Sequence, residues 1–431
     1  MSSSSTTSAS AQPRNVLPAL LALSLGGFGI GSSEFIAMGL LPSITQDLFP
    51  DAYSSSREAA LAHSGWLVGA YALGVVIGAP TVAIGIAKLR QKTALLTLVA
   101  AFVIGSLASA VLPSFEGIVL ARFLTGLPHG AYFGVAALVA AQLLGPGRRG
   151  LAAATVIGGL TVANVIGIPL ITWLGLLVGW RSAYLVIAGI FLVTLVSIAL
   201  VLPSIETDSK AVSIRAEIGV LRRGQVWLAL GIGSIGFSSL FAMYAYLAPL
   251  AEHYTKLAPE ALPWVLASTG VGMTIGNFGG GWAADRNVRL STYASFAVML
   301  TGLLILTSYS SNPIGLILGV TVVGMGASAL GPTLQTRLMD VGKEGPTLAA
   351  ALNHSAFNVG NALGAVIGGM VISVGLGYLA PIWTGIIFSA AGLAIACVSF
   401  ALDGRWVSKF RETTDTAADT THYAEKPLVR H

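Results

Sequence analysis

A carboxyl group inside an apolar stretch is the first feature of this sequence that could do chemistry. Of the 18 acidic residues, only Glu34 lies deep within a long apolar run. Because an ionised carboxyl costs several kcal/mol in such surroundings, its protonation near neutral pH becomes accessible. Glu34 is therefore predicted to carry a proton or to pair with a cationic substrate. The alternative is an acid near an interface, whose charge reaches water.

A basic residue in another apolar run is predicted to act on Glu34. Arg122 lies in the run 115–143, and His129 follows two helical turns later on the same face. If both runs cross an apolar membrane, Arg122 and Glu34 lie at similar depths. The positive charge of Arg122 then favours the ionised form of the Glu34 carboxyl. Arg122 and His129 are thus candidates for proton coupling. The alternatives are an arginine held by an ion pair or by backbone carbonyls, and a histidine satisfied by a neighbouring carbonyl.

Further polar side chains form a stripe along a later apolar run. His354, Asn358 and Asn361 recur there at helical spacing, and Asn164 has a similar setting in an earlier run. Such residues face other helices or a wet cavity, so they either line a substrate cavity or form hydrogen bonds between helices. Tyr244 belongs to a group of aromatic residues that either stack on a substrate or pack at the lipid interface.

The overall composition explains why these polar residues stand out. The 431 residues are 55% hydrophobic and only 10% charged, with a mean hydropathy of +0.81. A soluble globular protein has about 25% charged residues, so the sequence predicts an integral membrane protein. The net charge of +5 comes from Lys and Arg scattered through short loops and a tail, which does not indicate nucleic-acid binding.

The sequence offers no catalytic or cofactor site. Cys397 is the single cysteine and lies in an apolar stretch, so neither a disulfide framework nor a cysteine metal site is expected. We find no P-loop, no metal-ligand cluster and no nucleophile–base pair. The expectation is a protein that is not an enzyme, that needs no cofactor or metal, and that does not drive transport by ATP hydrolysis.

Twelve long apolar runs predict an all-α membrane fold. A span needs about 20 residues, and the runs cover 16–41, 61–86, 93–112, 115–143, 151–178, 182–202, 226–250, 261–284, 290–309, 313–336, 347–374 and 379–401. We predict a disordered N-terminus (1–15), a six-helix bundle (16–202), a connector (203–225), a second six-helix bundle (226–402) and a tail (403–431). Nineteen of the 23 Lys and Arg residues fall on the side of both termini and three on the other, which predicts cytoplasmic termini.

An internal repeat relates the two predicted bundles. Residues 66–78 match 264–276 without gaps, sharing a tryptophan and two glycines, and residues 164–167 match 361–364, sharing an asparagine and a glycine. A parallel six-plus-six repeat places a substrate site between the halves, near the middle of the membrane. The duplication therefore indicates a transporter.

Three helical motifs resemble those of a known family. Residues 121–134, which include Arg122 and His129, resemble the span-4 motif of drug:proton antiporters in the major facilitator superfamily, especially their arabinose-efflux and chloramphenicol-efflux branch. The segment 33–42, which contains Glu34, is similar to the span-1 motif of that branch, where the acid is implicated in proton coupling. The family's span-5 motif, which is associated with antiport, uses glycine and proline to bend and pack the helix. This sequence resembles that motif at Gly159, Gly167 and Pro169.

A fourth motif lies between the eighth and ninth runs. The family's loop motif, Gly-x-x-x-Asp-Arg-x-Gly-Arg, is matched by Gly281, Asp285, Arg286 and Arg289, with Val288 in place of the second glycine. The equivalent loop of the first bundle has Ala87 where the acid would be. We expect this loop to act as a latch, that is, a polar contact that keeps the cytoplasmic gate closed, and to be present in the second half only. Asp285 would lie near a helix N-terminus, and the arginines would bind carbonyls or carboxylates. The alternative is a basic loop that only sets topology.

The resemblance implies a proton-coupled secondary transporter of the cell (inner) membrane. It would exchange inward protons for an outgoing small organic molecule, such as a drug-like compound, a sugar or a metabolite. Its partners would be the substrate, protons and the lipid bilayer, and one chain would form the whole pathway as a monomer. The alternatives are an uncoupled facilitator of sugars or nucleosides and a membrane sensor that does not transport.

Overall fold

The computed structural model describes residues 16–56, 60, 63–203, 214–258 and 261–422, and these form helices without strands. The first half contains α1 (Val16–Leu48), α2 (Pro50–Ser55), α4 (Trp66–Ile86), α5 (Gln91–Val111), α6 (Phe115–Gly126), α7 (Pro128–Leu144), α8 (Arg149–Val162), a π-helical turn (Ala163–Gly167), α9 (Ile168–Val178) and α10 (Trp180–Val201). The second contains α12 (Gly224–Tyr244), α13 (Leu247–Pro249), a π-helical turn (Leu250–Tyr254), α14 (Leu262–Arg286), α15 (Val288–Tyr309), α16 (Pro313–Val341), α17 (Pro346–Ser373) and α18 (Ala380–His422).

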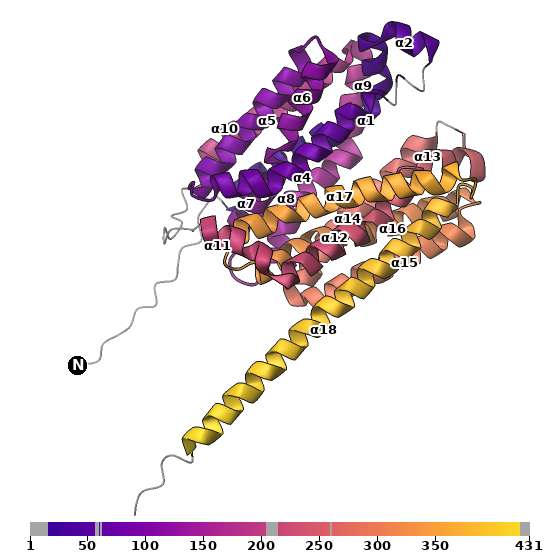
Figure 1. Cartoon of the computed structure of the whole chain (residues 1–431). Coiled ribbons are helices and arrows are strands. Elements are labelled where there is room, and N and C mark those ends of the chain that lie inside the picture. Colours follow the sequence, from indigo (N-terminus) through magenta and orange to yellow (C-terminus); the bar gives the residue numbers. More distant parts are fainter. Residues whose placement is uncertain (1–15, 57–59, 61–62, 204–213, 259–260, 423–431) are drawn as a thin grey trace, which may run out of the picture.

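Between the halves, α11 (Ile214–Gly219) and a 3₁₀ turn (Val220–Arg222) belong to the predicted connector. The predicted disordered N-terminus, 1–15, lies outside the described residues, as do 204–213 of the connector and 423–431 of the tail. The last helix, α18, does not end near residue 402, where the second bundle was predicted to end. It continues to His422 and extends away from both bundles (Figure 1).

Most of the predicted spans correspond to single helices. Within the described residues, eleven helical segments are long and apolar enough to cross a membrane. The fourth span joins α6 to α7, and the fifth joins α8 to α9 through the π-helical turn. The eighth predicted run forms α14, where Asn277 and several glycines lower the hydropathy. Because α14 packs against α16 and α8, Asn277 and Thr269 are fully buried in protein. The predicted all-α fold is confirmed.

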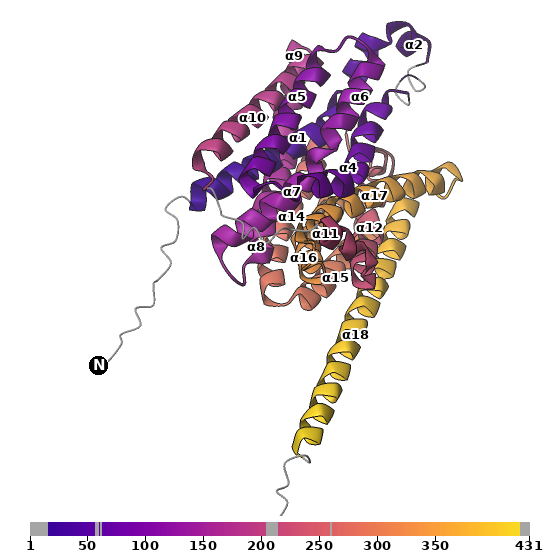
Figure 2. The same cartoon turned by 60° about the vertical axis from the view of Figure 1, so that its left-hand side comes forward.

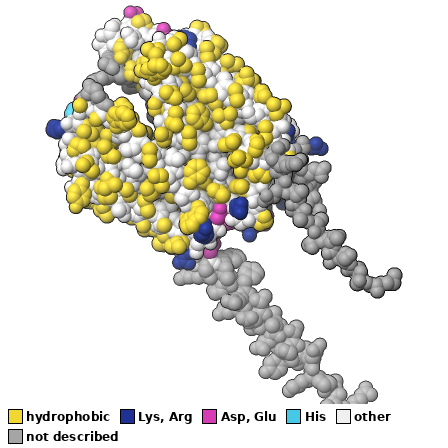
Figure 3. Space-filling model, turned by 180° about the vertical axis from the view of Figure 1, so that it is seen from behind, with side chains coloured by type: hydrophobic (Ala, Val, Ile, Leu, Met, Phe, Trp, Pro, Cys, Tyr) yellow, Lys and Arg dark blue, Asp and Glu magenta, His cyan; other side chains and the backbone are white. Residues whose placement is uncertain are grey.

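The two halves form separate bundles that meet at one end (Figures 1 and 2). We call this the terminal end, because α1 begins there and α18 leaves the bundle there. Towards the other end, which carries α2 and α13, the bundles diverge, and the surface is hollowed (Figure 3). Each half has its own apolar core, but Leu348, Ala351 and Leu352 of α17 join the core of the first half. The halves are therefore joined by packing near the terminal end.

The outer surface carries many large apolar side chains. Ile104, Trp173 and Ile314 are each more than 60% exposed, and apolar groups cover much of the face in Figure 3. A soluble monomer rarely exposes such a large contiguous apolar surface. The surface therefore suits a lipid environment.

Close packing of α1 on α8 depends on Gly159. A Cβ at this position would collide with the carbonyl oxygen of Ser24, so the two backbones would have to separate. Gly159→Ala is expected to cost about 1–3 kcal/mol and to lower the thermal midpoint of the purified protein by at least ~3 °C. Gly189→Ala is the control, because a methyl group on that exposed glycine of α10 would have no neighbouring atom within 4 Å. Equal midpoints for the two variants would contradict this packing role.

Candidate functional site

Arg122 lies at the centre of a buried cluster formed by α1, α4 and α6. Its Nη1 donates to the carbonyl oxygen of Ser33 at 2.7 Å, its Nε to that of Leu67 at 3.2 Å, and its Nη2 to that of Glu34 at 3.3 Å. The side chain is only 1% exposed. The fixed fork of guanidinium donors allows one side chain to satisfy acceptors on two helices. Arg122 therefore ties α6 to both α1 and α4.

The carboxyl of Glu34 lies near this cation without forming an ion pair with it. The Glu34 side chain is buried, and Arg122 donates to its backbone carbonyl rather than to its carboxyl group. Among the described residues, none of the ion pairs involves Glu34. The hydrogen bonds of Arg122 therefore do not involve the Glu34 carboxyl group.

Tyr71 and two histidines extend the cluster from the first half into the second. The guanidinium carbon of Arg122 lies 4.4 Å from the centroid of the Tyr71 ring. The Tyr71 hydroxyl lies 3.1 Å from His129 Nδ1, and His129 Nε2 lies 3.3 Å from His354 Nδ1 on α17. The His354 ring also stacks on Phe133, with centroids 4.1 Å apart. A continuous line of polar groups thus crosses the interface between the halves.

This line joins several predicted residues and includes Tyr71, which the sequence offered only as one of the aromatic residues that either stack on a substrate or pack between helices or at the lipid interface. A buried tyrosine hydroxyl usually has a hydrogen-bond partner, so Tyr71 was detectable as a polar group. Its partner was not detectable, because the contact depends on how α4 packs against α7. His354 forms a hydrogen bond between helices, which is one of the two roles that the sequence left open.

The other predicted cavity residues are less closely connected. Asn358 is buried and donates to the carbonyl oxygen of His354 at 3.1 Å, within its own helix. Asn361 and Tyr244 are half-buried, and Asn164 is half-buried in the π-helical turn of the fifth span. Within the described chain, these three side chains form no hydrogen bond with the Arg122 cluster. They lie outside the polar line that runs from Arg122 to His354.

The predicted antiporter-type motif coincides with the break in the fifth span. Gly159 lies in α8, Gly167 ends the π-helical turn, and Pro169 lies in the first turn of α9. At Gly167, a Cβ would lie 2.7 Å from the ring of Phe28 on α1. Proline disrupts the regular helical ladder and glycine allows close contact. The motif therefore shapes how the fifth span packs on α1, which carries Glu34.

The loop motif lies at the terminal end and connects the halves. Asp285 accepts the N–H groups of Gly150 and Leu151, at 2.5 and 2.9 Å, in the first turn of α8. Gly281 makes this approach feasible, because a Cβ there would lie 2.6 Å from the Gly150 carbonyl oxygen. A carboxylate is stabilised by the free N–H groups and the dipole at a helix N-terminus. Asp285 thus fastens α14 of the second half to α8 of the first.

The arginines of the motif make local contacts. Arg286 donates to the carbonyl oxygen of Trp282 at 3.0 Å, and its guanidinium carbon lies 3.6 Å from the centroid of the Trp282 ring. The guanidinium carbon of Arg289 lies 5.6 Å from the centroid of the Tyr293 ring. In these contacts each arginine is held by its own helix, while Asp285 makes the contact between the halves.

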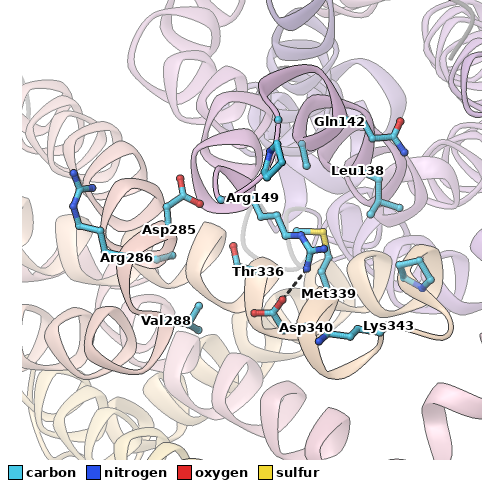
Figure 4. A pocket seen from close by; sticks show the side chains of 16 residues that line it. Leu138, Gln142, Arg149, Asp285, Arg286, Val288, Thr336, Met339, Asp340 and Lys343 are labelled. Atoms are coloured by element: carbon cyan, nitrogen blue, oxygen red, sulfur yellow. Dashed lines mark hydrogen bonds and ion pairs between the residues drawn. The ribbon is translucent and has the colours of Figure 1, made fainter. Parts of the chain in front are cut away.

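A cavity of about 970 Å³ adjoins this latch. It is lined by both halves, and Figure 4 shows the Arg149 and Asp340 side chains meeting across it. Their ion pair is 2.8 Å long and is about half exposed on each side. An exposed pair of this kind contributes roughly 0–1 kcal/mol. The partly buried contacts of Asp285 with two N–H groups, rather than this pair, are expected to dominate the polar connection at the terminal end.

Comparison with known proteins identifies the family. The family model described as Major Facilitator Superfamily matches residues 23–345 and 242–430. The chain belongs to the major facilitator superfamily. It is 37% identical over 380 residues to the inner membrane transport protein YdhP of Escherichia coli (strain K12), covering 88% of this chain and 94% of that protein. It is 28% identical to the chloramphenicol resistance protein of Streptomyces lividans, covering 88% of this chain and 95% of that protein.

A solved structure supports the same fold. The crystal structure of the E. coli fucose:proton symporter FucP matches with a TM-score of 0.70 at 17% identity, covering 90% of this chain and 99% of that one. This member of the major facilitator superfamily is therefore a multi-pass membrane transporter and not an enzyme. Transporters of this superfamily carry small molecules across the membrane.

Proposed function

We propose that this transporter exports a small organic molecule in exchange for protons. The observation that carries the proposal is the buried cluster around Arg122, in which the unpaired carboxyl of Glu34 lies beside a cation. The apolar surroundings favour the neutral carboxyl, whereas the guanidinium favours the ionised one. A group balanced between these two influences is suited to bind and release a proton during each cycle.

The proposed cycle uses the divergence of the halves. With cytoplasmic termini, as the Lys and Arg distribution favours, the terminal end faces the cytoplasm and the hollow faces outside. Glu34 takes up a proton from outside, and this allows the halves to rock until the cytoplasmic side opens. There Glu34 loses its proton as substrate binds, and the loaded protein returns to release the substrate outside. Such coupling requires that both ligands bind the two states with different affinities.

Several residues are proposed to support this cycle. Arg122 and His129 adjust the protonation of Glu34, and Asp285 holds the cytoplasmic side closed. The polar stripe of His354, Asn358 and Asn361, together with Asn164 and Tyr244, lines the substrate path once the halves separate. The line from Tyr71 through His129 to His354 supports communication between the halves, because opening the terminal end must change the contact between the two histidines.

The name of the Streptomyces relative, a chloramphenicol resistance protein, supports a drug-like cargo and therefore an efflux direction. The YdhP name supports location in the inner membrane. One chain contains both halves of the pathway, so we propose that the monomer is sufficient for transport.

Everted membrane vesicles test the proposal. A proton gradient is imposed across vesicles that contain the wild-type protein, and candidate compounds are added while a fluorescent dye reports the gradient. A transported compound is expected to dissipate the gradient, with no effect in vesicles that lack the protein. An uncoupled facilitator would move compound without moving protons, and a sensor would move neither. Either result would contradict the proposed antiport.

A further inference from the structure

The two halves place equivalent helix N-termini at the terminal end. Asp285, at the end of α14, accepts the N–H groups of Gly150 and Leu151 in the first turn of α8. The internal repeat pairs these two residues with Thr347 and Leu348, which lie in the first turn of α17. The first turn of a helix has N–H groups without partners inside the helix. The N-terminus of α17 therefore has the same need for a carboxylate as that of α8.

The loop that would meet this need by symmetry lacks an acid. Ala87, the counterpart of Asp285, follows α4 and has only a methyl side chain. Pro346 begins α17 without an N–H group, so the amides of Thr347 and Leu348 are the first that require acceptors. The repeat thus leaves a position beside α17 where a carboxylate is expected and where α4 supplies none.

Glu217 of the connector occupies this position. Its Oε2 accepts the N–H of Leu348 at 2.9 Å, while its buried Oε1 has no hydrogen-bond partner among the described residues. The nearby amide and hydroxyl of Thr347 also favour the ionised carboxylate. The residue is 0% exposed. Burial raises the pKa of Glu217, and the hydrogen bonds from α17 oppose this rise by favouring the ionised form. A carboxylate from a different part of the chain thus accepts an N–H in the first turn of α17, as Asp285 does with two N–H groups in the first turn of α8.

The connector is held between the halves at this point. α11 contacts α4 of the first half and α17 of the second. Just after it, Val220 packs with Leu338 of the second half, whereas Leu221 packs against the core of the first. Gly345 allows the close approach, because a Cβ there would lie 2.6 Å from the Cα of Glu217. A segment that packs on both halves is well placed to respond when they separate.

We propose that Glu217 is a positioning residue for alternating access. It supplies from the connector the carboxylate that the first-half loop lacks, and it holds the N-terminus of α17 against α4 while the terminal end is closed. Asp285 and Glu217 together form a two-sided latch. This inference rests on the proposed alternating-access function, so its test measures conformation directly and does not depend on transport or on proton coupling.

Spin labels on the full-length protein provide that test. Lys88→Cys and Lys343→Cys place labels on exposed positions of the two halves at the terminal end, in a Cys397→Ser background. Pulsed EPR then measures the distribution of distances between the labels. Glu217→Ala is expected to increase the fraction of molecules with separated labels about fivefold, because the N-terminus of α17 loses its acceptor and its compensating charge.

Three further variants separate the latch from a general structural effect. Glu217→Gln retains an acceptor oxygen without the charge, and it is expected to increase the separated fraction by a smaller factor than Glu217→Ala. It keeps the test possible if the alanine variant fails to fold. Ala87→Asp added to Glu217→Ala is expected to restore the parent distribution by returning an acid to its repeat position. Glu344→Ala is the matched control, because that nearby carboxylate is 65% exposed and pairs with Arg223. It is expected to leave the distribution unchanged.

Two results would overturn the proposal. If both Glu217 variants keep the parent distance distribution, even with a lower thermal midpoint, Glu217 is only a structural residue. If Glu217→Ala separates the labels but Ala87→Asp does not reverse the change, Glu217 does not replace the missing loop acid.

Discussion

Replacing Glu34 with glutamine is expected to abolish proton-driven accumulation of substrate in proteoliposomes while substrate exchange continues. Glutamine has nearly the same shape as a protonated glutamate but cannot release a proton. The Arg122 hydrogen bonds reach the backbone of residues 33 and 34, so they do not depend on the Glu34 carboxyl. The variant is therefore expected to fold and to bind substrate. We expect driven accumulation to fall at least tenfold under an imposed pH gradient.

Glu116→Gln is the matched control for this measurement. Glu116 lies in the first turn of α6, the helix that carries Arg122, but its side chain is exposed. Its replacement is expected to change driven accumulation less than twofold, since a solvated carboxylate contributes little to the buried cluster. Accumulation at the wild-type level by Glu34→Gln would refute the role of Glu34 as the proton carrier.

Replacing Arg122 with lysine is expected to reduce transport at least tenfold although the positive charge is retained. The guanidinium uses three nitrogens to bind carbonyl groups of α1 and α4, and one ammonium nitrogen does not reproduce that geometry. Each lost hydrogen bond from the charged guanidinium costs about 1.5–3 kcal/mol. The contact with the Tyr71 ring would also be lost or weakened. Initial rates of uptake into proteoliposomes measure the effect.

Arg181→Lys provides the comparison for Arg122→Lys. Arg181 forms a partly exposed ion pair with Asp47 near the start of α10 and lies over the Trp180 ring. Hydrogen bonds from Arg181 and Trp180 lower the pKa of Asp47, but such a surface pair is worth little to the fold. This variant is expected to retain at least half of the wild-type rate. Similar losses in both lysine variants would argue against a special role for the Arg122 cluster.

The sequence was sufficient to predict the architecture because the bilayer imposes a simple constraint. Long apolar runs must form helices that satisfy their own backbone hydrogen bonds, and their positions correspond to the observed spans. The eighth run shows the limit of hydropathy alone, since α14 is rich in glycine and contains Asn277, yet it is covered by α16 and α8. The run 261–284 was nevertheless predicted from its apolar residues, and the repeat, which pairs residues 264–276 with 66–78, agrees with that prediction.

The candidate site was only partly predictable, because some contacts depend on how distant helices meet. The isolated charges of Glu34 and Arg122 were detectable as costly groups in apolar runs. The contact between His129 and His354 depends on the approach of the two halves at α7 and α17, which no local pattern encodes. Glu217 was similarly hidden, because it lies in a polar connector where an acid is unremarkable until α11 packs against α17.

In the proposed cycle, substrate and proton compete through the carboxyl of Glu34. This competition is tested by measuring the release of protons from purified protein in a weakly buffered detergent solution as a transported compound is added. We predict that the wild type releases up to about one proton for each bound substrate near neutral pH and that Glu34→Gln releases none while still binding. Equal proton release by the two proteins, or substrate binding without release by the wild type, would contradict the account.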